Sequence, residues 1–137
     1  MELAPDLGQP HTTMAGVELE TGHALAAVRE ARTGLALDPQ GRRTMGEAGY
    51  VFVMTGNTEE ATKLLTTLKD VATRDVTAFE YAAMIEAALG RTGEALDSLE
   101  KQAHSAAVPG LQGMQHWHAF DALSADPRFR KLLAQAR

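Results

Sequence analysis

The stretch "TGNTEEATKLL", residues 55 to 65, decides the fold, because it has the features of a helix end, a tight turn and a second helix start. Gly56 lacks a Cβ atom, so it enters the left-handed conformation that ends many helices at little cost. We expect Thr58 to cap the second helix, with Glu59 and Glu60 in its first turn, where the helix dipole stabilises carboxylates. The stretch therefore predicts a helical hairpin.

The same turn recurs along the chain. A glycine stands at three positions separated by 34 residues, and an alanine follows each one five positions later: Gly22 and Ala27, Gly56 and Ala61, and Gly90 and Ala95. Glycine makes up only 12 of the 137 residues, so three glycines in one register indicate an internal repeat. We interpret the alanines as points where two helix backbones approach, because a larger side chain would hold them apart.

Each copy of the repeat has apolar residues at helical spacing on both sides of its glycine, which predicts two packed helices per copy. In the first copy we assign to these faces Met14, Val17 and Glu20, and then Leu25, Val28, Ala31 and Leu35. In the second copy they are Met45, Ala48, Phe52 and Thr55, and then Ala61, Leu64, Leu65, Leu68 and Val71. In the third copy they are Phe79, Ala82, Ala83 and Ala87, and then Ala95, Leu99, Ala103 and Ala106.

Three stretches resemble a known family: "TGHALAAVREARTGLALDP" at 21 to 39, the opening stretch at 55 to 65, and "LGRTGEALDSL" at 89 to 99. They are similar to the tetratricopeptide repeat (TPR) family, whose 34-residue unit is a helix pair with a turn glycine and a closing proline. The resemblance implies an all-α fold, a right-handed superhelix of about three helix-turn-helix hairpins with a C-terminal capping helix. The repeats would span residues 8–41, 42–75 and 76–107 of one domain covering residues 1–137.

The N-terminal residues fit the same register. Leu3 and Pro5 occupy the repeat positions of Leu37 and Pro39. Residues 2–7 are therefore expected to be the end of a truncated preceding repeat, and the chain to be the C-terminal part of a longer bacterial repeat array.

The C-terminal residues are predicted to close the stack of hairpins. Residues 108–125 are expected to form a loop and a plug that includes Trp117, Phe120 and Leu123. Asp126 followed by Pro127 marks a helix start, and the next apolar face comprises Phe129, Leu132 and Leu133. We therefore predict a capping helix at residues 126–136, because the last apolar face of such a stack needs a cover with a polar outer side. This segment is similar to the closing segment of repeat arrays in bacterial signalling proteins.

Composition and charge exclude several classes of protein. The net charge of -5 argues against nucleic-acid binding, which needs an excess of lysine and arginine. The chain has no cysteine, no secretory signal and no apolar run long enough to cross a membrane, so we expect a soluble cytoplasmic protein. No nucleotide-binding, hydrolase or metalloprotease motif is present, so neither an enzyme nor a cofactor is predicted.

One histidine cluster invites a metal-binding hypothesis. His116 and His118 flank Trp117, and His104 lies upstream. Two imidazoles at i and i+2 of an extended segment point the same way, yet structural sites use four defined ligands. The sequence therefore predicts no metal site, and a His-rich metal-binding or enzymatic helical domain is a remote alternative.

The TPR resemblance implies that the first helix of each hairpin lines a concave groove. The groove positions would be Gln9, Thr12, Gly16 and Glu20 in the first copy, Arg43, Gly46, Tyr50, Val53 and Met54 in the second, and Thr77, Glu80, Met84, Ala87 and Ala88 in the third. The principal candidates are Arg43, Tyr50, Val53, Met54, Glu80, Met84 and Ala87. These side chains predict a groove for an apolar peptide or helix, or for the chain's own C-terminal segment.

The sequence thus predicts a protein–protein interaction module, a scaffold or a regulatory domain of a larger protein. The alternative is a regulatory or sensor domain of a bacterial signalling protein, such as a transcription regulator or a kinase. The first helix, at about residues 9–21, would lack an upstream neighbour and expose an apolar edge at Met14 and Val17, which predicts self-association.

Overall fold

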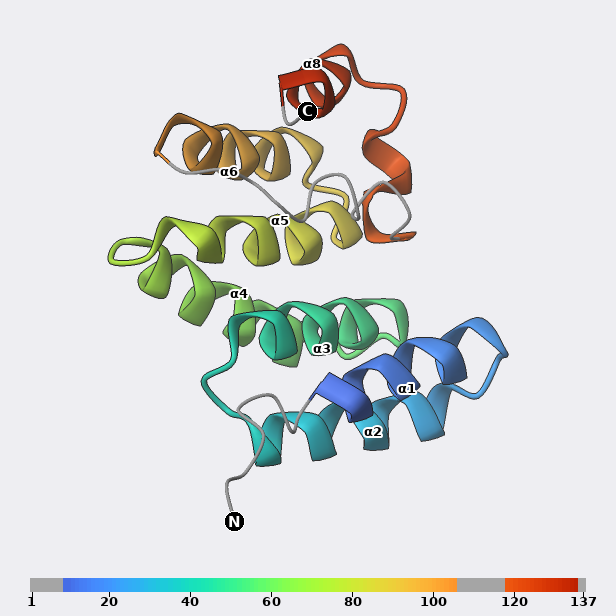
Figure 1. Ribbon diagram of the computed structural model, residues 1–137. Coiled ribbons are helices and arrows are strands. Elements are labelled where there is room, and N and C mark those ends of the chain that lie inside the picture. The colour runs from blue at the N-terminus through green and yellow to red at the C-terminus, as the bar shows by residue number, and fades with distance from the viewer. Residues whose placement is uncertain (1–8, 106–117, 136–137) are drawn as a thin grey trace. The chain divides into compact units, whose positions relative to one another are not determined.

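The computed structural model describes residues 9 to 105 and 118 to 135, and all regular secondary structure in these ranges is helical (Figure 1). In chain order the elements are α1 (Gln9–Glu20), α2 (Ala24–Leu37), α3 (Arg42–Met54), α4 (Thr58–Ala72), the 3-10 helix η1 (Val76–Ala78), α5 (Phe79–Ala88), α6 (Thr92–Ser105), the 3-10 helix η2 (His118–Leu123) and α8 (Pro127–Gln135). The expected all-α class is confirmed for these residues. The predictions for residues 2–7 and for Trp117 lie outside the described residues.

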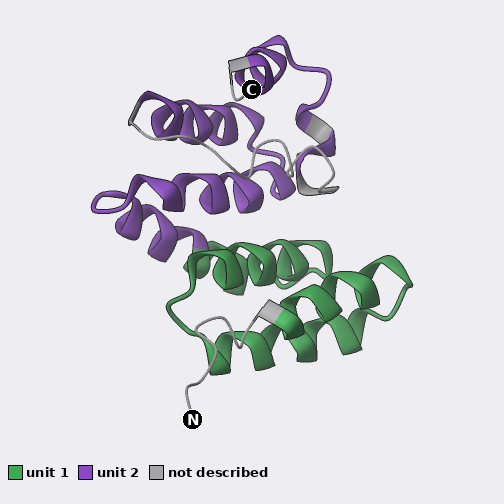
Figure 2. Cartoon of the chain, in the orientation of Figure 1, with its two compact units in different colours: residues 1–64 green, residues 65–137 purple. Residues whose placement is uncertain are grey.

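The chain divides into two compact units, residues 1–64 and residues 65–137 (Figure 2). The boundary lies inside α4, so the second predicted repeat contributes to both units. Each unit has its own set of packed helices.

The three turn glycines adopt the predicted conformation. Gly22, Gly56 and Gly90 have φ angles of 85°, 84° and 82°, in the left-handed region that favours glycine. In each turn the glycine N–H donates to the carbonyl three residues earlier, and the next N–H donates to the carbonyl five residues earlier. The second bond joins His23 to Glu18 at 2.7 Å, Asn57 to Phe52 at 2.7 Å, and Arg91 to Glu86 at 2.9 Å. This pair of bonds is the Schellman motif, and it repeats at all three predicted positions.

The alanine that follows each turn is fully buried, since Ala27, Ala61 and Ala95 are all 0% exposed. Each of these alanines is thus enclosed by neighbouring atoms, as expected where two helices pack closely.

The cap of α4 lies one residue before the predicted one. Helix α4 begins at Thr58, and the carbonyl of Asn57 accepts the first helical bond from the N–H of Ala61 at 3.2 Å. The prediction of Thr58 as the cap is wrong, because the turn is so short that Asn57 both closes α3 and precedes α4. Glu59 and Glu60 do stand in the first turn of α4, as predicted.

In the first unit, α1, α2 and α3 pack against one another in pairs. The buried apolar residues of this unit are Ala15, Ala27, Val28, Ala31, Met45, Ala48, Val51, Phe52 and Ala61. Two polar contacts join its helices: His11 Nδ1 lies 2.8 Å from Glu30 Oε2, and Arg32 Nη2 donates to Glu60 Oε1 at 2.6 Å. The hydrogen bond to Glu60 raises the pKa of Arg32 above its ordinary value, so this guanidinium stays charged.

The exposed apolar residues of the first hairpin follow the prediction in part. Met14 and Val17 are 46% and 49% exposed, as expected of an apolar edge on the first helix. Their assignment, with the exposed Glu20, to the packed face of that helix is therefore wrong. Leu25 is 83% exposed, so its assignment to the packed face of α2 is wrong. The equivalent residues Glu59 and Gly93 are also exposed, which shows that this position of the repeat faces solvent.

In the second unit, α5 packs against α6 and η2, and α6 also packs against α8. The principal buried apolar residues are Leu65, Leu68, Ala72, Ala78, Ala82, Ala83, Met84, Ile85, Ala87, Leu96, Leu99, Phe120, Leu123, Phe129 and Leu132. The buried side chain of Gln102 links α6 to the start of α5. Its Oε1 accepts the backbone N–H of Glu80 at 3.0 Å, and its Nε2 donates to the Glu80 carboxylate at 3.0 Å.

A helix, α8, forms where the capping helix was predicted. The carboxylate of Asp126 accepts the backbone N–H of Arg128 at 2.8 Å, which confirms the predicted helix start. Phe129 is buried and stacks on Phe120 with ring centroids 6.0 Å apart, as expected of a plug and its cover. Residues 118–123 of the predicted loop form η2 instead.

Candidate interaction surface

Three of the five groove positions predicted for the second copy lie along one side of α3. Arg43, Tyr50 and Met54 share their spacing with Glu47, and positions i, i+4, i+7 and i+11 fall on one helix face. None of the four is buried, and Met54 is 53% exposed. We call these four residues the α3 stripe. Val53 lies next to Met54 and is half-buried.

The polar end of the α3 stripe is held in place by a shared carboxylate. Glu47 Oε1 accepts the Thr12 hydroxyl at 2.6 Å, and Glu47 Oε2 accepts Nε of Arg43 at 3.2 Å. Because one partner comes from α1 and the other from α3, the contacts fix the orientation of both side chains. The sequence reasoning missed Glu47. Its i, i+4 spacing from Arg43 was the available signal.

Helix α1 packs against α3 and supplies the neighbouring part of this surface. Gly16 occupies the repeat position of Tyr50, and a Cβ atom built on it would meet no atom within 4 Å, so the space beside it is open. Glu20 occupies the repeat position of Met54 and is exposed. The candidate surface therefore consists of the α3 stripe with Gly16 and Glu20.

Two of the groove residues predicted for the first and second copies are buried. Thr12 is only 2% exposed, since its hydroxyl is directed to Glu47 between the helices. Gly46 is buried on the packed side of α3. For Gln9 the structure describes the backbone alone.

The third-copy positions belong to the other unit and are mostly buried. Glu80, Met84 and Ala87 are 3%, 3% and 5% exposed, so their prediction as open groove positions is wrong. All six consecutive residues from Ala82 to Ala87 are buried, as in a helix covered on every side. Thr77 and Ala88 are half-buried.

A buried charge in the second unit was also missed by the sequence reasoning. The Glu86 side chain is 0% exposed, its Oε1 accepts the Ser98 hydroxyl at 2.6 Å, and its Oε2 lies 2.8 Å from Nζ of Lys69. Oε2 has no aligned hydrogen bond, so its contact with Lys69 is an ion pair. The three residues come from α5, α6 and α4, and the cluster joins these helices.

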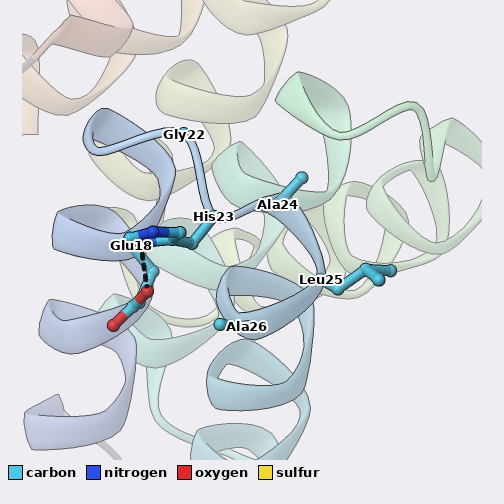
Figure 3. Close-up of a pocket in the computed structure, with 6 residues that line it drawn as sticks. All are labelled: Glu18, Gly22, His23, Ala24, Leu25 and Ala26. Atoms are coloured by element: carbon cyan, nitrogen blue, oxygen red, sulfur yellow. Dashed lines mark ion pairs between the residues drawn. The ribbon is translucent and has the colours of Figure 1, made fainter.

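An open hollow of about 570 Å³ lies at the turn between α1 and α2 (Figure 3). It is lined by Glu18, Gly22, His23, Ala24, Leu25 and Ala26. His23 Nδ1 lies 2.9 Å from Glu18 Oε2, and Figure 3 shows the Leu25 side chain directed away from this pair. The two titratable groups that line the hollow therefore pair with each other at the surface.

The predicted histidine cluster is largely outside the described residues. His104 is exposed on α6, His116 falls in the undescribed segment, and only the backbone of His118 is described. Within residues 9–105 and 118–135, the structure contains no group of three or more His, Asp or Glu side chains that could hold a metal ion.

Among the helices of the described ranges, none combines the length and the apolar character needed to span a membrane.

Comparisons of the chain with protein-family models, with curated proteins and with solved structures found no match.

Proposed function

We propose that the chain is a protein–protein interaction module related to the TPR family, and that it binds an apolar peptide or helix through the α3 stripe and the adjoining residues of α1. Support comes from the helical turn that recurs at Gly22, Gly56 and Gly90, with the same φ angle to within a few degrees and the same bonds each time. Helical repeats of this kind present extended binding surfaces. The right-handed superhelix implied by the TPR resemblance is part of this proposal.

The observation that carries the proposal is the chemistry of the α3 stripe. Tyr50 and Met54 give it an aromatic and a flexible apolar side chain. Tyrosine is enriched at protein interfaces, and methionine adapts its shape to varied partners. Arg43, fixed by Glu47, provides a charged anchor at one end. The expected ligand is therefore an apolar segment with an acidic residue near that end.

The biological setting is also a proposal. A cytoplasmic scaffold or a regulatory domain within a larger protein agrees with the absence of cysteine and with the charge of -5. A catalytic role is not part of this proposal.

Selection from a random peptide library on the immobilised full chain tests this function. We expect enrichment of apolar peptides that bind the unmodified chain and lose binding to Met54→Glu and Tyr50→Ala. Leu25→Glu is the matched control, because Leu25 is an exposed apolar residue outside the surface. Enriched peptides that bind all variants equally, or no enrichment at all, would contradict the proposal.

A further inference from the structure

Three positions on α1 are exposed where the other copies of the repeat are buried. Met14 is 46% exposed, whereas the equivalent Ala48 and Ala82 are 0% exposed. Val17 is 49% exposed, whereas the equivalent Val51 and Ile85 are 1% and 0% exposed.

The third position, Pro10, differs from its equivalents in the same way. Pro10 is exposed, and its equivalents Thr44 and Ala78 are both 0% exposed. Residues 10, 14 and 17 fall at i, i+4 and i+7, so they form one stripe along the helix, which we call the α1 edge. The equivalent face is thus covered in the second and third copies of the repeat and exposed in the first.

The packing of α3 indicates what shape covers such a face. A helical hairpin precedes α3, and α3 packs against both of its helices, α1 and α2. A helix is therefore the shape of partner that the α1 edge fits.

We infer that the α1 edge is a self-association site, at which α1 of a second copy packs antiparallel to α1. The charges of the helix select this orientation. Glu18 and Glu20 stand in its last turn, and its first turn contains no acidic residue. In an antiparallel pair each acidic end lies beside the positive dipole end of the partner, whereas a parallel pair would bring the carboxylates together.

The apolar residues of the α1 edge suit a two-fold axis. With the axis between Met14 and Val17, Met14 of one copy contacts Val17 of the other and the reverse contact follows by symmetry. Residues 10, 14 and 17 of the α1 edge are not part of the α3 stripe, so variants at Met14 or Val17 and variants at Tyr50 or Met54 test self-association and peptide binding separately.

Sedimentation equilibrium of the full chain at about 10 to about 500 µM tests the inference, since mass action makes a dimer depend on concentration. We expect a monomer–dimer equilibrium. Met14→Glu and Val17→Glu should each raise the dissociation constant at least about tenfold, because they place a charge in an apolar contact. Leu25→Glu, at a position exposed in all three copies, should leave it unchanged.

Single-cysteine variants test the orientation, and the absence of native cysteine removes any background. A mixture of Met14→Cys and Val17→Cys chains should crosslink between the two variants faster than either variant crosslinks with itself. Circular dichroism should show unchanged folds, since both side chains are exposed. A monomer at every concentration, a dimer equally weakened by Leu25→Glu, or faster crosslinking of Met14→Cys chains with one another would each overturn the inference.

Discussion

Oε2 of Glu86, on a side chain with 0% exposure, lies 2.8 Å from Nζ of Lys69, whose side chain is 40% exposed. The two members of this ion pair therefore stand in different environments. The carboxylate depends on its partners, which also include the Ser98 hydroxyl, while the ammonium also reaches solvent. Removal of the two charges should consequently have unequal effects.

Lys69→Met should lower the free energy of unfolding by about 2 kcal/mol, because it leaves a buried carboxylate without a counter-charge. Glu86→Gln should lower it less, since its amide oxygen still accepts the Ser98 hydroxyl and the Lys69 ammonium can hydrate. Urea denaturation of both variants at neutral pH measures the difference. Equal effects, or a larger effect of Glu86→Gln, would show that the ion pair does not stabilise the carboxylate.

Replacing a turn glycine with alanine should lower the stability of the fold, whereas the same replacement of a nearby helical glycine should not. Gly90 has a φ angle of 82°, so Gly90→Ala should cost about 1 to 2 kcal/mol through the left-handed backbone alone. Gly93 lies in α6, where a new Cβ atom meets nothing within 4 Å, and Gly93→Ala should be neutral or stabilise by up to about 1 kcal/mol. Thermal unfolding of the two variants checks this prediction. Similar midpoints for both would refute the role of the turn conformation.

The contact between α6 and α8 should weaken in acid. Arg128 Nη2 donates to Asp97 Oδ1 at 2.7 Å, and this hydrogen bond lowers the pKa of Asp97 below its ordinary value of 3.8. Because the pKa of Asp97 is lower in the folded state, its contact with Arg128 stabilises the fold fully above the ordinary pKa of Asp97. This stabilisation is lost as the pH falls through the lowered pKa. Asp97→Asn should therefore be less stable than the unmodified chain near neutral pH, and the difference should shrink as the pH falls below 3.8. A difference that grows in acid would contradict the assignment.

The stacked pair at the C-terminal end should carry much of the stability of the cap. Phe129 is 2% exposed and stacks on Phe120, so Phe129→Ala should cost about 3 kcal/mol by leaving a cavity. Leu133 on the same helix is half-buried, and Leu133→Ala should cost clearly less. Denaturation of the two variants compares them directly, and equal losses would argue against a packed role for the aromatic pair.

The features that were predictable from the sequence depend on local backbone chemistry. Glycine adopts a positive φ angle at lower cost than other residues, so the turns at Gly22, Gly56 and Gly90 could be placed without knowledge of the packing. The start of α8 could also be predicted, because it depends on a contact between the neighbouring residues Asp126 and Arg128.

Burial could not be predicted as well, because it depends on what surrounds each helix. Leu25 has the apolar character of a packed residue and yet faces solvent, while Met84 is buried in a helix that is covered on all sides. For the same reason the third-copy groove positions were assigned to a surface that they do not reach. Glu86 was missed because a charged residue in an apolar helix gives no sign of its partners until the neighbouring helices are placed.

Binding of an enriched apolar peptide to the α3 stripe is measured most directly by isothermal titration calorimetry with the full chain and its variants. We predict a saturable affinity that falls at least about tenfold in both Met54→Glu and Tyr50→Ala, as expected when an apolar anchor of an interface is lost. The affinity should be unchanged in Leu25→Glu and Met14→Glu. Equal affinity for all four variants and the unmodified chain would contradict the assignment of this surface.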